Sequence, residues 1–147
     1  MKIHLASTIH DPKAGMKWMS DKFLSQLQDL YSEIYLTSSP YTDQGYLDDL
    51  DHAGIEIKKR KDNKIGQTYF DSINRANTEE ADYVFYCDFD RILHWIKDYP
   101  KELKKLINQL KSQDKKSKVD YIVAQRAEKG YKEHQESLYV FCFFVTL

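Results

Sequence analysis

The chain has 147 residues, with 22 Lys and Arg against 23 Asp and Glu, so its formal net charge is −1. This length predicts one domain with a substantial core. A balanced charge provides no overall field for attracting nucleic acid or an anionic membrane, which argues against both as partners. No apolar run is long enough to span a bilayer, and the N-terminus lacks the apolar core of a signal peptide. Its two cysteines form no zinc pattern, and together these features predict a cytoplasmic protein.

The first third of the chain predicts a strand, a helix and a second strand. Residues 2–9 form the first predicted strand. Apolar residues then recur at three- and four-residue steps over residues 16–30, which indicates an amphipathic helix. The second strand is predicted over residues 33–37. Hydroxyl side chains lie where these two strands end: Ser7, Thr8, Thr37 and Ser38.

The middle of the chain continues the alternation with shorter elements. Thr42 or Asp43 can cap the start of a short helix, and Gly54 is well placed to end it. Apolar side chains at helical spacing predict a further helix after a polar loop. In chain order, the predictions are the short helix to residue 53, a strand over 55–58, the polar loop over 60–64 and the helix over 65–76.

The most informative stretch is the apolar run over residues 83–87, which predicts a buried strand and is followed at once by Asp88 and Asp90. Side chains of a strand alternate between its two faces, so these carboxylates are expected to point the same way where the strand ends. Adjacent carboxylates repel each other unless a cation neutralises them, and hard oxygen ligands suit Mg²⁺ or Mn²⁺, which in turn suit a diphosphate. The sequence therefore predicts a metal–nucleotide site at Asp88 and Asp90. The structural alternative is a polar loop with a capping aspartate.

The pattern is less regular toward the C-terminus. A helical turn is expected over residues 92–97, a firmer helix after Pro100 and a strand over residues 119–124. Residues 138–147 are almost wholly apolar. Alternating strands and helices with short loops predict an α/β fold, a three-layer sandwich around a mostly parallel sheet, in a single domain over residues 1–147. Ligands of such sheets bind beyond the carboxyl ends of the strands.

Two common nucleotide motifs are absent from the sequence: no Gly-x-Gly-x-x-Gly follows the first strand, and there is no Walker A lysine loop. A dehydrogenase or a P-loop kinase is therefore not predicted. The order of Asn63-Lys64-Ile65-Gly66, a helix, Ala81-Asp82-Tyr83 and finally Asp88-Phe89-Asp90 resembles the GT-A type nucleotide-diphospho-sugar transferases, most nearly the family 2 glycosyltransferases. In that family a loop glycine opens a helix, and an Ala-Asp-Tyr-type turn leads into an apolar strand that ends in Asp-x-Asp. The resemblance extends from the first strand to about Arg126.

The resemblance implies a domain that moves a sugar from a nucleoside-diphosphate sugar to an acceptor. It implies that Asp88 and Asp90 hold a divalent cation, Mn²⁺ or Mg²⁺, between the two phosphates, where the cation offsets charge on the departing nucleoside diphosphate. Arg91 is expected to pair with phosphate through its planar guanidinium. The other side chains expected beside the nucleotide are Ser7, Thr8, Thr37, Arg60, Asn63 and Gly66.

The chain departs from the family pattern at three places. The family usually has an aspartate after the second strand, at the base-binding position, where this chain has Thr37-Ser38-Ser39. The Arg-Asn pair common in the following helix is replaced by Asp71-Ser72. The acceptor-binding half and its catalytic carboxylate normally follow the fifth strand, where little chain remains. An inverting transferase needs a base there, because the acceptor hydroxyl loses its proton as it attacks, and the candidates are Glu133 and Glu136.

Two other functions stay open. The first is a non-catalytic binding module with the same fold, which the short downstream part favours, and residues 138–147 are then expected to form an exposed apolar surface for self-association. The second is a nucleotidyltransferase, which also uses aspartate-held Mg²⁺ on a related sheet. It is less favoured, because residues 10–15 are a poor version of the glycine-rich and basic loop expected after the first strand.

Overall fold

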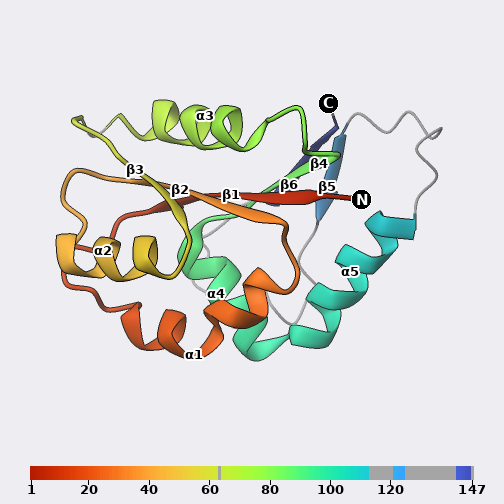
Figure 1. The fold of residues 1–147 in the computed structure, drawn as a ribbon, viewed down its shortest axis with the longest axis horizontal. Helices are drawn as coiled ribbons and strands as arrows, with labels where there is room; N and C mark the ends of the chain where they lie inside the picture. Colours follow the sequence, from red (N-terminus) through yellow and green to blue (C-terminus); the bar gives the residue numbers. More distant parts are fainter. Residues whose placement is uncertain (63, 113–120, 125–141, 147) are drawn as a thin grey trace.

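A computed structural model describes residues 1–62, 64–112, 121–124 and 142–146. The elements are, in chain order, β1 (Ile3–Ile9), α1 (Lys17–Gln28), β2 (Glu33–Ser38), α2 (Gln44–His52), β3 (Glu56–Lys59), α3 (Ile65–Ala76), β4 (Tyr83–Tyr86), α4 (Phe89–Asp98), α5 (Pro100–Ser112), β5 (Tyr121–Ala124) and β6 (Cys142–Thr146). They form three layers, in which the sheet lies between α3 on one face and the other four helices on the other face (Figure 1).

The sheet has six strands in the order β3-β2-β1-β4-β6-β5. The first four strands along the chain run parallel to one another, and β6 pairs antiparallel with both β4 and β5. A helix connects each strand to the next parallel one, which is the crossover that parallel strands require. The predicted α/β fold with a mostly parallel sheet is therefore confirmed.

The apolar stretch over residues 138–147 contributes β6 to the interior of the sheet. Phe144 is the register partner of Phe85 in β4 and of Ile122 in β5, so the backbone of β6 pairs on both sides. Pairing on both sides leaves β6 no open strand edge for another chain. Residues 138–141 and 147 lie outside the described residues, and self-association through this stretch stays a prediction.

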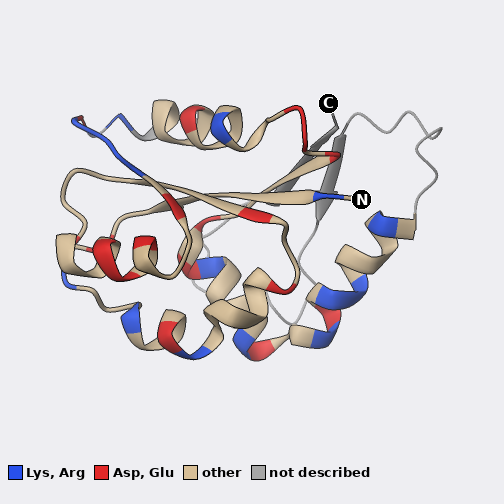
Figure 2. Ribbon diagram, viewed as in Figure 1, with Lys and Arg blue, Asp and Glu red and all other residues tan. Residues whose placement is uncertain are grey.

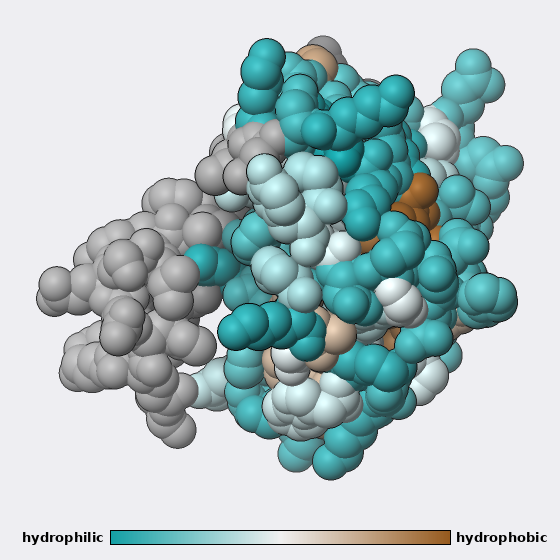
Figure 3. Space-filling model, turned by 90° about the vertical axis from the view of Figure 1, so that its left-hand side faces the viewer, coloured by the Kyte–Doolittle hydropathy of each residue, from teal (hydrophilic) through white to brown (hydrophobic). Residues whose placement is uncertain are grey.

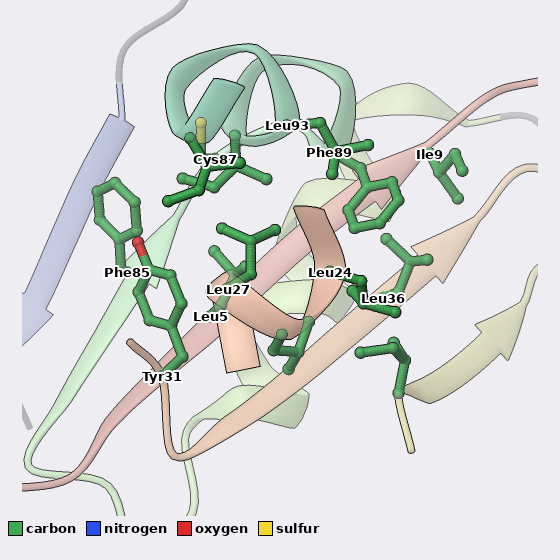
Figure 4. Packing of buried hydrophobic residues seen from close by; sticks show 14 of the residues in the cluster. Leu5, Ile9, Leu24, Leu27, Tyr31, Leu36, Phe85, Cys87, Phe89 and Leu93 are labelled. Atoms are coloured by element: carbon green, nitrogen blue, oxygen red, sulfur yellow. The ribbon is translucent and has the colours of Figure 1, made fainter. Parts of the chain in front are cut away.

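The larger hydrophobic core fills the space between the sheet and helices α1, α2, α4 and α5 (Figure 4). Leu5 from β1 and Phe85 from β4 are fully buried in it. The ring of Phe85 stacks on that of Tyr31, with 5.7 Å between their centroids and 6° between their planes. The apolar faces of three strands, β1, β2 and β4, and of four helices thus meet in one core, which fixes how the helices lie against the sheet.

A smaller core lies under α3, on the other face of the sheet. It contains Ala6, Val84 and Tyr86 from the strands and Ala76 from the helix. These strand residues alternate with the ones that point into the larger core, as the two-residue period of a strand requires. The side chain of Tyr86 therefore lies on the α3 face, where it reaches the edge at which β4 ends.

The predicted ends of α2 are confirmed. A carboxylate oxygen of Asp43 accepts a hydrogen bond of 2.8 Å from the backbone N–H of Tyr46, which is the N-cap arrangement. Gly54 follows the helix with a φ of +88°, a backbone conformation that glycine adopts without strain.

Helix α4 differs most from the prediction, which expected only a helical turn over residues 92–97. The helix spans Phe89–Asp98, because Phe89, Ile92, Leu93 and Ile96 recur at helical spacing and are all buried in the larger core. Only Cys87 and Asp88 separate β4 from this helix. The turn from strand into helix is therefore tight, and it begins right after Tyr86.

No helix among the residues that the structure describes is both long enough and apolar enough to cross a membrane.

Candidate functional site

Strands β1 to β4 all end at one edge of the sheet, which we call the carboxyl edge and which lies on the left in Figure 1. Ligands of open α/β sheets bind beyond this edge, because the loops that follow the strands supply side chains there. Figure 3 faces this side of the molecule and shows mostly hydrophilic residues. A basic stretch lies at the end of β3 and in the loop after it (Figure 2), and it consists of Lys58, Lys59, Arg60, Lys61 and Lys64.

Asp88 and Asp90 lie at the carboxyl edge, but not on a strand. The expectation that strand alternation points both the same way is wrong, because β4 ends at Tyr86 and α4 begins at Phe89. Asp88 is the N-cap residue of α4, although its carboxylate makes no capping bond, and Asp90 is exposed in the first helical turn. The buried ring of Phe89 anchors the turn between them. Both carboxylates are thus at the positive end of the helix dipole, which favours negative charge.

Two hydroxyl side chains hold the carboxylate of Asp88. The hydroxyl of Thr8 donates to Oδ1 of Asp88 over 2.8 Å, and the hydroxyl of Tyr86 donates to the same oxygen over 2.7 Å. The two hydroxyl oxygens are 3.1 Å apart. Since Thr8 belongs to β1 and Tyr86 to β4, the pairing of these two strands fixes the position of Asp88.

The electrostatics of Tyr86 support this arrangement. Burial raises the pKa of Tyr86 above its usual value, and the negative charge of Asp88 raises it further. The phenol therefore stays protonated at neutral pH and acts as a hydrogen-bond donor to the carboxylate.

Arg91 and Tyr69 complete the surroundings of Asp88. The Nε atom of Arg91 lies 3.3 Å from Oδ2 of Asp88. The ring of Tyr69, on α3, meets that of Tyr86 edge to face with 5.5 Å between centroids. Burial raises the pKa of Tyr69, and the negative charges of Asp88 and Asp90 raise it further. The positive charge of Arg91 lowers this pKa in part. Tyr69 thus lies within electrostatic reach of both carboxylates and of Arg91.

The number of carboxylates at this edge limits how it could hold a cation. Within the described ranges, no three His, Cys, Asp or Glu side chains form a group that could hold a metal. Mg²⁺ in nucleotide sites usually takes only one or two carboxylates, and completes its coordination with phosphate oxygens and water. Asp88 and Asp90 can supply that number of carboxylates. A cation bound by these two carboxylates would need its remaining ligands from phosphate or water.

Two residues expected beside the nucleotide, Ser7 and Thr37, are fully buried. The hydroxyl of Ser7 donates to the carbonyl oxygen of Cys87 over 2.6 Å. The hydroxyl oxygen of Thr37 accepts a bond of 3.4 Å from the guanidinium of Arg75. Both hydroxyls contact protein atoms below the carboxyl edge, so they contribute to the support of the site rather than to its surface.

Arg60, also expected beside the nucleotide, forms ion pairs with Asp62 and Asp71. Only 8 % of its side-chain surface is exposed. Asp71 and Ser72 occupy the positions at which the resembled family has Arg-Asn, and both have structural contacts here. Asp71 pairs with Arg60, and the hydroxyl of Ser72 donates to the carbonyl oxygen of Ser7 over 2.7 Å.

Gly66 lies in the first turn of α3 and is exposed, and a Cβ added to it would meet open space. The predicted opening of a helix beside this glycine is confirmed. Asn63 and the two candidate bases, Glu133 and Glu136, lie outside the described residues, so their roles stay predictions.

A second polar cluster lies where β1 and β2 end. Nδ1 of His10 and the hydroxyl oxygen of Ser39 are 2.8 Å apart, and Ser39 in turn lies 3.2 Å from the hydroxyl oxygen of Thr42. The ring of the exposed Tyr41 meets that of His10 edge to face. These side chains extend the polar surface of the carboxyl edge from the Asp88 network toward β2.

A shallow hollow of about 520 Å³ lies on α5. Helix α5 itself is at the right in Figure 1, away from the carboxyl edge. The position of the hollow on the outer face of a helix is typical of a solvated charged surface. The hollow is therefore not part of the candidate site. Its lining consists of Lys101, Lys104, Lys105, Asn108, Gln109 and Ser112.

The sequence did not identify Tyr86 and Tyr69 as parts of the site. Tyr86 was assigned only to a buried strand, and Tyr69 only to the helix predicted over residues 65–76. Both belong to the α3 face at the carboxyl edge, and that position depends on the pairing of β1 with β4 and on the docking of α3. One sequence signal was present, since Tyr86 and Asp88 are two residues apart at the end of a strand.

No family model matches this chain, and no curated protein matches it.

Proposed function

We propose that this domain binds a nucleoside-diphosphate sugar together with Mn²⁺ or Mg²⁺ at the carboxyl edge and transfers the sugar to an acceptor. The observation that carries the proposal is the carboxylate of Asp88, which Thr8 and Tyr86 hold at that edge, next to Arg91. The α/β fold with a mostly parallel sheet supports it, because this is the fold that the resemblance to GT-A transferases implied.

In this proposal Asp88 and Asp90 hold the cation, which when bound acts as a Lewis acid toward the diphosphate. Arg91 supplies a planar guanidinium that pairs with phosphate oxygens. The basic stretch after β3 adds positive charge at the same edge. These fixed charges favour an anionic ligand and stabilise the charge that develops on the leaving diphosphate.

Sugar transfer breaks the bond between the anomeric carbon and a phosphate oxygen, and forms a bond from that carbon to the acceptor oxygen. The acceptor hydroxyl loses its proton in this step, so a base is needed if the reaction inverts the anomeric centre. Glu133 and Glu136 remain the candidates for that base.

A second candidate function is a binding module that holds a sugar nucleotide without turning it over. One observation favours it. Both carboxylate oxygens of Asp88 already have partners within the protein, from Thr8, Tyr86 and Arg91, so the network is complete without a metal. Such a module keeps nucleotide binding but releases no nucleoside diphosphate.

The test is a thermal-shift screen of nucleoside-diphosphate sugars with Mn²⁺, followed by an assay for released nucleoside diphosphate. A ligand that binds only the folded state raises its stability by about 2.7 kcal/mol at a hundred times its Kd, which is a measurable shift in Tm. We expect Asp88→Asn to abolish the shift, whereas Asp98→Asn, at the far end of α4, should keep it. Binding without release supports the binding module, and the lack of any shift contradicts both functions.

A further inference from the structure

Arg91 and Asp88 form an ion pair inside the candidate site. Nε of Arg91 lies 3.3 Å from Oδ2 of Asp88, across the first turn of α4. Only 13 % of the Arg91 side chain and 16 % of the Asp88 side chain are exposed. Water and salt therefore weaken this pair less than they weaken pairs on the open surface.

The other carboxylate oxygen of Asp88 has no room for a further partner. Oδ1 accepts hydrogen bonds of 2.8 Å from Thr8 and 2.7 Å from Tyr86. An ionised carboxylate has about four acceptor positions, two on each oxygen, so these two donors fill Oδ1. A cation that binds Asp88 must therefore approach Oδ2, which is the oxygen that Arg91 faces.

We infer that Arg91 competes with the divalent cation for Asp88, and that the diphosphate removes this competition by taking the guanidinium for itself. Without a nucleotide, Arg91 neutralises Asp88, so the carboxylate attracts a second cation only weakly. A diphosphate offers several oxygens, and the planar fork of arginine can bind two of them at once. Once Arg91 pairs with phosphate, Oδ2 is released to the cation.

This inference rests on the proposed function and adds its regulation: cation and nucleoside diphosphate bind as a coupled pair. Such coupling is reciprocal. The factor by which the nucleotide raises the affinity for the cation equals the factor by which the cation raises the affinity for the nucleotide. Couplings between sites in proteins typically amount to about 5- to 150-fold. The site therefore stays free of metal until a sugar nucleotide arrives.

The test compares Mn²⁺ binding by the wild type, Arg91→Gln and Lys97→Gln. Electron paramagnetic resonance counts the free Mn²⁺ in a titration of each protein, first without nucleotide and then with UDP as the probe. Lys97→Gln is the matched control, since it removes a positive charge from the same helix without touching Asp88. Arg91→Met is the second variant, should Arg91→Gln fold poorly. Mn²⁺ and UDP are used at the same concentrations in every titration, so the binding of Mn²⁺ to free UDP is the same background in each of them.

We expect Mn²⁺ alone to bind Arg91→Gln about tenfold more tightly than the wild type, and UDP at saturating Mn²⁺ to bind it more weakly. Lys97→Gln should match the wild type in both titrations. If the wild type binds Mn²⁺ with UDP but Arg91→Gln and Arg91→Met bind Mn²⁺ alone no more tightly, the competition is refuted and the proposed function stands. If none of the proteins binds Mn²⁺ with or without UDP, the proposed function fails and the inference fails with it.

Discussion

The hydroxyl of Tyr86 lies 2.7 Å from Oδ1 of Asp88, so the last residue of β4 directly holds the residue that precedes α4. Thr8, from the neighbouring strand β1, contacts both of them. The strand pairing that builds the sheet thus also fixes the carboxylate at its edge. A change in this network is expected to affect both the stability of the domain and its affinity for ligand.

The first prediction concerns the Tyr86→Phe variant. This variant removes a hydrogen-bond donor to the charged carboxylate of Asp88 and should lower the free energy of unfolding by about 1.5 kcal/mol. This value is at the low end for hydrogen bonds to charged groups, because Asp88 is not fully buried. Urea denaturation measures this. Tyr83→Phe is the control, since Tyr83 is also buried in β4 but belongs to the larger core on the other face. Equal losses in both variants would contradict a role for the Tyr86–Asp88 bond.

The second prediction compares two phenylalanines. Phe89 is fully buried between Asp88 and Asp90, so Phe89→Ala should destabilise the domain by about 3–5 kcal/mol. Phe70 is 60 % exposed, and Phe70→Ala should change the free energy of unfolding by less than about 0.5 kcal/mol. Denaturation curves of the two variants should differ clearly. Similar midpoints would mean that Phe89 does not anchor the start of α4.

The third prediction concerns the ion pairs of Arg60, whose side chain is mostly buried. Asp71→Asn should lower the stability more than Asp62→Asn does, because 21 % of the Asp71 side chain is exposed against 50 % of the Asp62 side chain. Removal of the more buried partner leaves a buried guanidinium with weaker compensation. Thermal denaturation of both variants at low and high salt tests this order, and a larger loss in Asp62→Asn would contradict it.

The fourth prediction is a loss of stability at alkaline pH. Burial raises the pKa of Tyr46 to about 12 in the folded state, against about 10 in an unfolded chain. Between these two pH values the folded protein therefore holds a proton that the unfolded chain releases. The contribution of Tyr46 to the free energy of unfolding is complete below about pH 10 and is lost as the pH rises toward about 12.

Urea denaturation across this pH range measures the loss. One proton contributes a slope of about 1.4 kcal/mol per pH unit, so Tyr46→Phe should make the decline shallower than in the wild type. Tyr41→Phe is the control, because Tyr41 is 62 % exposed. A decline that is unchanged in Tyr46→Phe would rule out Tyr46 as its source.

Local patterns were enough to predict most of the fold. The helices α1, α2, α3 and α5 follow from the spacing of apolar residues and from caps such as Asp43, and the strands follow from apolar runs. The start of α4 was missed, because Asp88-Phe89-Asp90 alternates polar and apolar residues as a strand does. Its helical form depends on the burial of Phe89 in a core that the strands and other helices complete.

The site was harder to predict than the fold, because its contacts join distant segments. The Thr8–Asp88 bond joins residues 80 positions apart in the sequence. Arg60 also has a partner that the sequence did not indicate. A basic residue after a strand is typical of a phosphate-binding loop, yet its side chain pairs with Asp71 on the following helix. Whether a basic residue in this position faces a ligand or pairs with Asp71 depends on how α3 docks on the sheet. The pattern of a single sequence does not contain that information.

The central claim is that a metal-bound nucleoside diphosphate lies at the Asp88 network. The most direct test is the broadening of backbone amide signals by Mn²⁺ in nuclear magnetic resonance spectra, with UDP present and with Mg²⁺ as the diamagnetic reference. We predict that the signals of Thr8, Tyr69 and Arg91 are the first to broaden, and that Asp88→Asn abolishes the effect. Broadening centred elsewhere, or unchanged in Asp88→Asn, would contradict the claim.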